Sequence, residues 1–344
     1  MKHFNVYQTA DFFTSGGEPK FADLGLSTFD GHSHIKLNPF AEHRPEVGAD
    51  QVAGAHGVIV LTPRITKDTV AAADDLLAIG RFGVGYDNVD VAACTAADVA
   101  LTITAGAVDR PVAEATVGWM IGLTHHMKTK DLLVCEGKWD ERSGYMGGEL
   151  RDRTLGIVGL GGIGRKLLEL LSNWGMNQPL AFDPFIDPLA AAALGVKLVN
   201  LDELMRSSDF VSIHCPLTDK TRGLVGRREI GLMKPDAYLI NTARGGIVDE
   251  DALYEALEQG AIAGAALDCF ATEPLTAPSR FGELENVLLA PHSIAWTNEM
   301  FRDMGRAACQ SMVDLSLRRI PHAVVNREVL DRPGFKRKWE RICG

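Results

Sequence analysis

The chain has 344 residues, which is enough for two domains of ordinary size, and its composition is typical of a globular protein. No stretch has the apolar length of a membrane span, and the first sixteen residues lack the apolar run of a signal peptide, so we expect a cytoplasmic protein without a membrane partner. The formal net charge of −10 argues against general nucleic-acid binding.

A strand followed by a helix recurs from Gly57 onward. Apolar runs predict strands at 58–61, 78–79 and 99–103, with helices at 67–77 and 91–97 between them. A longer helix is expected to begin near Asp109, a suitable N-cap, to carry Pro111 in its first turn and to end near Met127. The alternation predicts a first α/β domain, and the long helix leads into a second.

The second domain shows the same alternation. A buried strand at 155–158 is followed by a helical pattern up to Trp174, which Gly175 can end, and by a strand at 179–182. Further strands and helices are predicted at 198–199, 201–205, 210–213, 237–240, 249–257, 263–267 and 287–289. A final helix at 297–317 should return the chain to the first domain. Repeated strand-helix units predict mostly parallel, doubly wound sheets.

Three glycines stand at G-x-G-x-x-G spacing between the strand at 155–158 and its helix. Gly159 would allow a tight turn, Gly161 would let the backbone approach a diphosphate, and Gly164 would let the helix pack closely on the strand. The next strand ends in Asp183, about 20 positions further on, and an acidic residue there suits a ribose 2′-hydroxyl while repelling a 2′-phosphate. The pattern predicts a dinucleotide site that favours NAD over NADP. The alternative is a glycine-rich turn before an ordinary helix.

Four polar side chains follow predicted strands of the second domain: Arg244, Asp268, Glu273 and His292. Ligands of an open α/β sheet bind outside the carboxyl ends of its strands, so we expect these residues to share one crevice with the dinucleotide. A protonated imidazole can donate to a carbonyl oxygen as hydride arrives, while a guanidinium stabilises the growing charge and a carboxylate orients the imidazole. Taken singly, each residue is more often a surface ion pair or a hydrogen-bonded loop residue.

Metal and disulfide chemistry are not expected. Six cysteines are scattered without C-x-x-C spacing, which fits reduced thiols. The histidine pairs His32/His34 and His125/His126 lack acidic or thiol companions at metal spacing, so we predict no metal site. One basic cluster, residues 336–338 with Arg341, is expected to be a solvated tail or a subunit contact.

The ordered motifs of the chain resemble those of the D-2-hydroxyacid dehydrogenase family. They are Phe82 to Asp90 (FGVGYDNVD), Gly159 to Gly164 (GLGGIG), His214 to Thr218 (HCPLT), Asn241 to Gly245 (NTARG), Leu267 to Phe270 (LDCF) with Glu273-Pro274, and Ala290 to Ser293 (APHS). The resemblance covers most of the chain. It implies a flavodoxin-like substrate domain, residues 1–107 with 300–344, a Rossmann NAD-binding domain, residues 108–299, a cleft between them and a homodimer.

The resemblance also implies roles for single residues. Arg244 would bind and polarise a 2-oxo acid, His292 would be the acid/base, and Glu273 would be its carboxylate partner. Asp268 would hold the nicotinamide amide, and backbone amides of Val84 and Gly85 would bind the substrate carboxylate. The remaining residues expected to line the cofactor are Gly162, Ile163, Pro216, Thr221, Thr242 and Ala243.

Some positions depart from the commoner family pattern and leave the substrate open. Ala105 replaces a frequent proline, and residues 293–296 replace a smaller, glycine-containing run. Trp296 is a candidate pocket wall, with Tyr145 and Met146 as companions, and packing is the alternative for each. Arg81 and Arg110 are candidates for binding a second anionic group, with surface solvation as the alternative.

The leading hypothesis is an NAD-dependent dehydrogenase or reductase acting on a D-2-hydroxy acid such as glycerate, with glyoxylate, hydroxypyruvate or a sugar acid as the related substrate type. The second is 3-phosphoglycerate dehydrogenase without its regulatory domain. Formate dehydrogenases of this fold pair the histidine with glutamine, where this chain has Glu273; phosphite oxidation is less easily set aside. From another class, an NADH-sensing corepressor-like binding protein would retain the same three residues.

Overall fold

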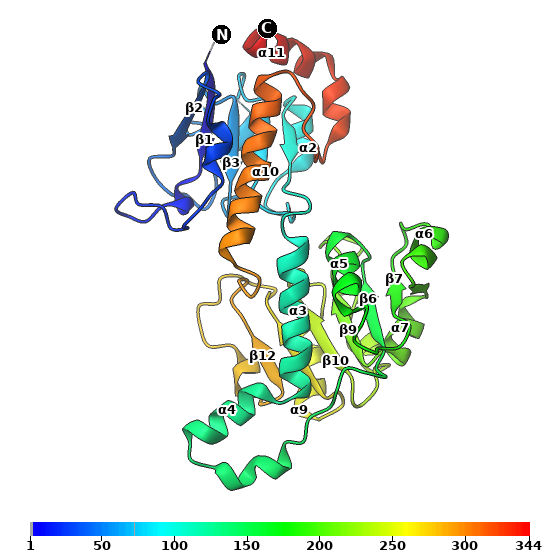
Figure 1. Ribbon diagram of the computed structural model, residues 1–344. Helices are drawn as coiled ribbons and strands as arrows, with labels where there is room; N and C mark the ends of the chain where they lie inside the picture. Colours follow the sequence, from blue (N-terminus) through cyan, green and yellow to red (C-terminus); the bar gives the residue numbers. More distant parts are fainter. Residues whose placement is uncertain (1–2, 72) are drawn as a thin grey trace. The chain divides into compact units, whose positions relative to one another are not determined.

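The computed structural model describes residues 3–71 and 73–344, which form two compact units (Figure 1). The first unit is Met1–Val108 with Trp296–Gly344, and the second is Asp109–Ala295. The chain therefore re-enters the first unit at Trp296, four residues before the expected position of 300. Aromatic packing accounts for this, because the Trp296 ring lies edge-on to Phe21 and Phe301, with centroid distances of 5.9 and 5.1 Å.

The first unit is built on a five-stranded parallel sheet of order β2-β1-β3-β4-β5. Its strands are β1 Phe4–Gln8, β2 Ile35–Pro39, β3 Gly57–Val60, β4 Ala78–Arg81 and β5 Ala100–Thr102. This is the flavodoxin-like strand order, so the predicted fold class of this unit is confirmed. Strands β1 and β2 precede the region in which the sequence pattern was interpretable.

The helices of the first unit are α1 Lys67–Val70, α2 Val91–Ala96, α10 Asn298–Ser316 and α11 Pro333–Cys343. Short 3-10 helices lie at Ala10–Phe12, Leu26–Phe29 and Arg327–Asp331. The helix expected at 67–77 is wrong for residues 71 and 73–77, while residue 72 lies outside the described residues. Leu77 already donates its N–H to the carbonyl of His56 beside the sheet, so the chain must leave the helix before that residue.

The second unit has a seven-stranded parallel sheet of order β12-β11-β10-β9-β6-β7-β8. Its strands are β6 Leu155–Val158, β7 Leu180–Phe182, β8 Lys197–Leu198, β9 Phe210–Ile213, β10 Tyr238–Asn241, β11 Gly264–Leu267 and β12 Val287–Leu289. The order reverses between β9 and β6, which is the switch point of a Rossmann sheet, and the predicted doubly wound fold is confirmed.

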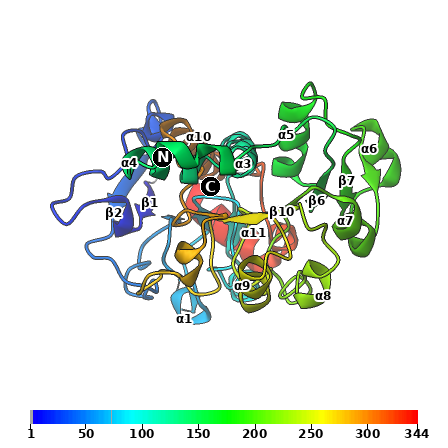
Figure 2. The same ribbon diagram turned by 90° about the horizontal axis from the view of Figure 1, so that it is seen from below.

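Helices cover both faces of this sheet. The helices of this unit are α3 Asp109–Thr124, α4 Met127–Cys135, α5 Gly162–Leu171, α6 Pro188–Ala193, α7 Leu201–Ser207, α8 Arg227–Ile230 and α9 Glu250–Glu258, with 3-10 helices at Trp139–Gly144 and Arg280–Glu283. Figure 2 shows α3 and α5 on one face and α8 and α9 on the other. Helix α5 ends at Leu171 and not at Trp174, because the exposed Trp174 has little packing to support another turn.

A half-buried lysine is one of the contacts that hold the C-terminal helix α11 in the first unit. Lys338 Nζ donates to the carbonyl oxygens of Leu76, Ala97 and Asp98 at 3.0, 3.0 and 3.1 Å. Burial lowers the pKa of Lys338, although the nearby carboxylates oppose that shift. Part of the basic cluster expected to be a solvated tail or subunit contact is therefore an internal contact. Among the helices of residues 3–71 and 73–344, none combines the length and apolar character needed to cross a bilayer.

Replacing Lys338 by methionine should lower the free energy of unfolding by about 2 kcal/mol, because three carbonyl oxygens lose a charged donor. The matched control is Lys336→Met in the same helix, since Lys336 is exposed and its Nζ contacts the exposed Asp331 at 3.3 Å. Denaturant unfolding of both variants measures the difference. Equal stability of the two variants would contradict the assignment.

Candidate active site

The carboxyl ends of neighbouring strands bring the expected site residues together in the second unit. Strands β10, β11 and β12 are adjacent and parallel, with Asn241 paired to Leu267 and Leu267 paired to Leu289. Arg244, Asp268 and His292 follow these three strands by one to three residues. The glycine-rich turn follows β6, and Asp183 follows its neighbour β7. All of these residues therefore lie at one edge of one sheet.

The three glycines of the turn have the backbone properties predicted for them. Gly159 has φ +95°, a left-handed conformation that favours glycine. A methyl group on Gly161 would meet nothing within 4 Å, which leaves its backbone open to a ligand. A methyl group on Gly164 would come within 2.8 Å of the carbonyl of Gly159, so this glycine serves packing of α5 on β6. These features fit a dinucleotide diphosphate at the start of α5, where Ile163 is half-buried.

Asp183 is held firmly beside the glycine turn. Its Oδ2 accepts the N–H of Leu160 at 2.8 Å, and its Oδ1 accepts the N–H of Phe185 at 2.9 Å. Each carboxylate oxygen has a further lone pair, so the side chain can still accept from a ribose hydroxyl. The acidic residue predicted at this point thus has a fixed orientation as well as the right place in the sequence.

Residues expected to line the cofactor lie after β9 and β10. The hydroxyl of Thr242 is buried and has no hydrogen-bond partner among the described residues, and an unpaired buried hydroxyl is costly unless a ligand completes it. Thr221 Oγ1 donates to the carbonyl of Pro216 at 2.6 Å, which closes the loop after β9. Ala243 donates its N–H to Asn241 Oδ1 at 3.1 Å. Of these groups, the unpaired hydroxyl of Thr242 is the one that fits a hydrogen bond with a bound NAD.

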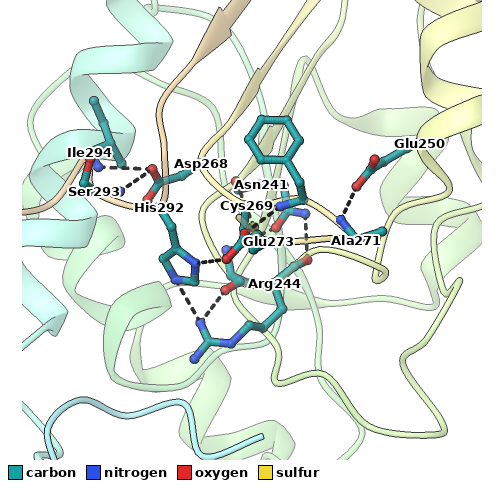
Figure 3. A network of polar contacts seen from close by, with 12 residues as sticks. Asn241, Arg244, Glu250, Asp268, Cys269, Ala271, Glu273, His292, Ser293 and Ile294 are labelled. Carbon is teal, nitrogen blue, oxygen red and sulfur yellow. Dashed lines mark hydrogen bonds and ion pairs between the residues drawn. The ribbon is translucent and has the colours of Figure 1, made fainter. Parts of the chain in front are cut away.

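An arginine, a histidine and a glutamate form one polar network (Figure 3). His292 Nδ1 lies 2.7 Å from Glu273 Oε2, and His292 Nε2 lies 3.5 Å from Arg244 Nη1. Arg244 Nη1 also donates to the carbonyl of Ala243 at 2.7 Å. With Nδ1–H donating to the carboxylate, Nε2 is the ring nitrogen that exchanges a proton with a ligand. The sequence prediction that these three side chains converge agrees with this geometry.

Glu273 is held as an ionised acceptor. Its Oε1 accepts the N–H of Phe270 at 2.7 Å while Oε2 faces His292. Burial opposes ionisation, yet the pKa of Glu273 lies below its ordinary value because these two hydrogen bonds and the charges of His292 and Arg244 favour the carboxylate. The ionised Glu273 fixes the orientation of the His292 ring through this contact.

Asp268 fixes the backbone of the loop that carries His292. This residue is buried, with 5% of its surface exposed, and its Oδ1 accepts the N–H groups of Ser293 and Ile294 at 2.8 and 3.1 Å. Its carbonyl accepts the N–H of His292 at 2.7 Å, and His292 adopts φ +54°. Burial raises the pKa of Asp268, although the two N–H groups oppose that shift. Asp268 therefore orients His292, a structural part additional to the cofactor contact expected for it.

Two residues that hold the site were missed as candidates. The buried Asn241 donates from Nδ2 to the carbonyl of Arg244 at 2.9 Å and so shapes the arginine loop. At Gly245, a methyl group would lie 1.9 Å from the carbonyl of Phe270. The loop that carries Arg244 and the loop that carries Glu273 are therefore in backbone contact at this point. The glycine directly after Arg244 was the available signal, but close approach of two distant loops cannot be read from one sequence.

The other candidate residues have local partners. Val84 and Gly85 follow β4 in the first unit, so their role in carboxylate binding stays a prediction. Arg110 forms a 2.6 Å ion pair with exposed Glu114, which supports surface solvation. Arg81 donates to the carbonyl of Phe82. Tyr145 lies 3.5 Å from Glu285 Oε2 and edge-on to His126.

The chain is similar to known proteins over most of its length. The family model for the "D-isomer specific 2-hydroxyacid dehydrogenase, NAD binding domain" matches residues 117–293. A glyoxylate reductase of Korarchaeum cryptofilum is 34% identical over 323 residues, covering 91% of this chain and 96% of that protein. A D-3-phosphoglycerate dehydrogenase of Methanocaldococcus jannaschii is 38% identical over 264 residues, covering 76% of this chain and 50% of that protein.

The solved structures include a D-lactate dehydrogenase of Aquifex aeolicus complexed with NAD and lactic acid. It superimposes with a TM-score of 0.80 at 25% identity and covers 93% of this chain and 99% of that one. The chain spans about half the length of the phosphoglycerate dehydrogenases among its relatives.

Alanine substitutions at two glycines of the turn should have different effects. Gly161→Ala should leave thermal stability unchanged and weaken NADH binding at least about tenfold, because its methyl group enters the open space that a diphosphate would use. Gly164→Ala should destabilise the fold by about 1–3 kcal/mol, because its methyl group meets backbone. Thermal unfolding and NADH titration separate the two effects, and a Gly161→Ala variant with unchanged NADH affinity would refute the cofactor assignment.

Proposed function

Because this chain belongs to the D-isomer-specific 2-hydroxyacid dehydrogenase family, we propose that it is an NAD-dependent oxidoreductase that interconverts a D-2-hydroxy acid and its 2-oxo acid. The observation that carries the proposal is the network of Arg244, His292 and Glu273 at the carboxyl edge of the sheet that also carries the glycine turn. Bound NAD supplies the hydride acceptor or, when reduced, the hydride.

His292 acts as the general acid in the reduction of the 2-oxo acid. Its Nδ1–H is engaged by Glu273, which leaves the proton on Nε2 to be donated to the substrate's carbonyl oxygen. In the reverse direction, Nε2 accepts the hydroxyl proton. The nearby carboxylate favours the imidazolium at the moment of donation, because opposite charges stabilise each other in a partly buried site.

Arg244 binds the substrate next to the acid. Its guanidinium is within 3.5 Å of the proton-carrying Nε2, so one side chain can polarise the carbonyl oxygen and contact the adjacent carboxylate. The carbonyl of Ala243 holds one of its terminal nitrogens, which limits the directions in which the fork can point. Backbone amides of Val84 and Gly85 are proposed to bind the substrate carboxylate.

The substrate class proposed is that of small 2-oxo acids such as glyoxylate and hydroxypyruvate. The relative described as a glyoxylate reductase aligns along 96% of its own length. Oxidation of 3-phosphoglycerate ranks second, because the relatives of that name align along only about half of theirs. Sugar-acid relatives stay within the proposed class.

We further propose that the protein is a homodimer. Helix α4 and the 3-10 helix Trp139–Gly144, here called the arm, extend away from the sheet of the second unit (Figure 1). Large apolar side chains of the arm and its flanking residues are exposed: Met127, Leu132, Val134, Trp139 and Met146. Trp139 and Met146 expose 62% and 80% of their surfaces, and a second copy would cover such a strip.

Replacing His292 by alanine should lower kcat by about two orders of magnitude or more, the scale of losing a general acid. NADH affinity should change little, because the imidazole faces Arg244 and Glu273. Steady-state turnover and NADH titration measure the two quantities. A near-normal kcat would exclude the role of His292.

The substrate class and the cofactor preference are tested by turnover assays of the wild type with glyoxylate, hydroxypyruvate and 3-phosphohydroxypyruvate, each with NADH and NADPH. Tight NADH binding without turnover of any 2-oxo acid would favour a sensor instead, and equal efficiency with NADPH would count against the role of Asp183.

The dimer proposal predicts that a double variant, Trp139→Ser with Met146→Ser, sediments with a larger fraction of monomer than the wild type at low micromolar concentration. Both side chains are exposed, so folding should persist. The exposed Phe185→Ser outside the arm is the control. A wild-type chain that sediments as a monomer would contradict the proposal.

A further inference from the structure

An aspartate lies against the first residue of the proposed diphosphate-binding helix. Asp109 is the first residue of α3, and Gly162 is the first residue of α5. A methyl group on Gly162 would come within 2.1 Å of Asp109 Oδ2 and 2.6 Å of its Cγ. The carboxylate therefore rests directly on the Gly162 backbone. Gly162 lacks a side chain because Asp109 occupies that space, whereas the neighbouring Gly161 faces open space.

The position of this carboxylate sets two anions in competition. A helix N-terminus carries partial positive charge and unpaired N–H groups, and it stabilises one nearby anion. In α5 this end is also where the glycine turn would bring the dinucleotide diphosphate. A diphosphate would approach Gly161 with a second negative charge one residue away.

The cation nearest in charge to Asp109 is already engaged by another residue. Lys166 of α5 interacts electrostatically with Asp109, and its Nζ is paired with Glu169 at 2.5 Å. Burial raises the pKa of Asp109, and the charge of Lys166 opposes that shift. A neutral side chain of the same shape would fill the same space without the charge.

We propose that Asp109 is an internal competitor for the N-terminus of α5 that weakens dinucleotide binding and speeds release of the cofactor after turnover. The inference rests on the proposed NAD-dependent function and adds a residue that tunes its cofactor affinity. Asp109 acts through charge on a ligand's diphosphate, so its effect requires phosphate and not the nicotinamide or adenine ring.

The test compares Asp109→Asn, which removes the charge and keeps the shape, with the wild type. The control is Glu114→Gln, which removes one negative charge from the exposed side of the same helix. Calorimetric titration with NADH, ADP and adenosine, and stopped-flow release of NADH, give the readouts. We expect Asp109→Asn to bind NADH and ADP about tenfold more tightly, with slower NADH release and unchanged adenosine affinity. Glu114→Gln should match the wild type.

Three results would overturn the inference. Unchanged or weaker NADH binding by Asp109→Asn would show that the carboxylate does not compete. An equal gain in Glu114→Gln, or in adenosine binding, would show a general effect of net charge. Failure of the wild type to bind NADH at all would overturn the proposed cofactor site as well, which distinguishes that failure from the first two.

Discussion

Parallel pairing of β10, β11 and β12 is the constraint on which the site depends. Each strand ends at the same edge, and each delivers one polar residue there within three positions of its end. Residues separated by tens of positions in the chain thus meet at one edge of one sheet. The packed interior of the sheet positions these groups more rigidly than long surface loops could.

Each charged group at this edge of the sheet is held in position by a neighbouring polar group. Asp268, buried under the histidine loop, fixes the backbone that carries His292, and Glu273 fixes the ring. Arg244 is held in turn by the carbonyl of its neighbour and by a loop that Asn241 shapes. Chemistry and stability are therefore coupled, because the same carboxylates that orient the reacting groups also satisfy buried N–H donors.

Sequence reasoning succeeded where a local rule decides the outcome. The glycine turn, the strands around it and the polar residues at strand ends follow from short-range patterns, and so the Rossmann sheet and the convergence of Arg244, Glu273 and His292 could be predicted. Prediction from the sequence failed where contacts with backbone far away in the chain determine the local structure. The helix expected at 67–77 is shorter because Leu77 donates its N–H to the carbonyl of His56. Lys338 is not solvated because its Nζ donates to the carbonyl oxygens of residues 76, 97 and 98. The contact of Asp109 with Gly162 has the same origin.

The glycine at position 245 restricts how this protein can evolve. Its α-carbon lies so close to Phe270 that any side chain would separate the loop of the guanidinium from the loop of the glutamate. Neither loop can therefore change its length or path independently of the other.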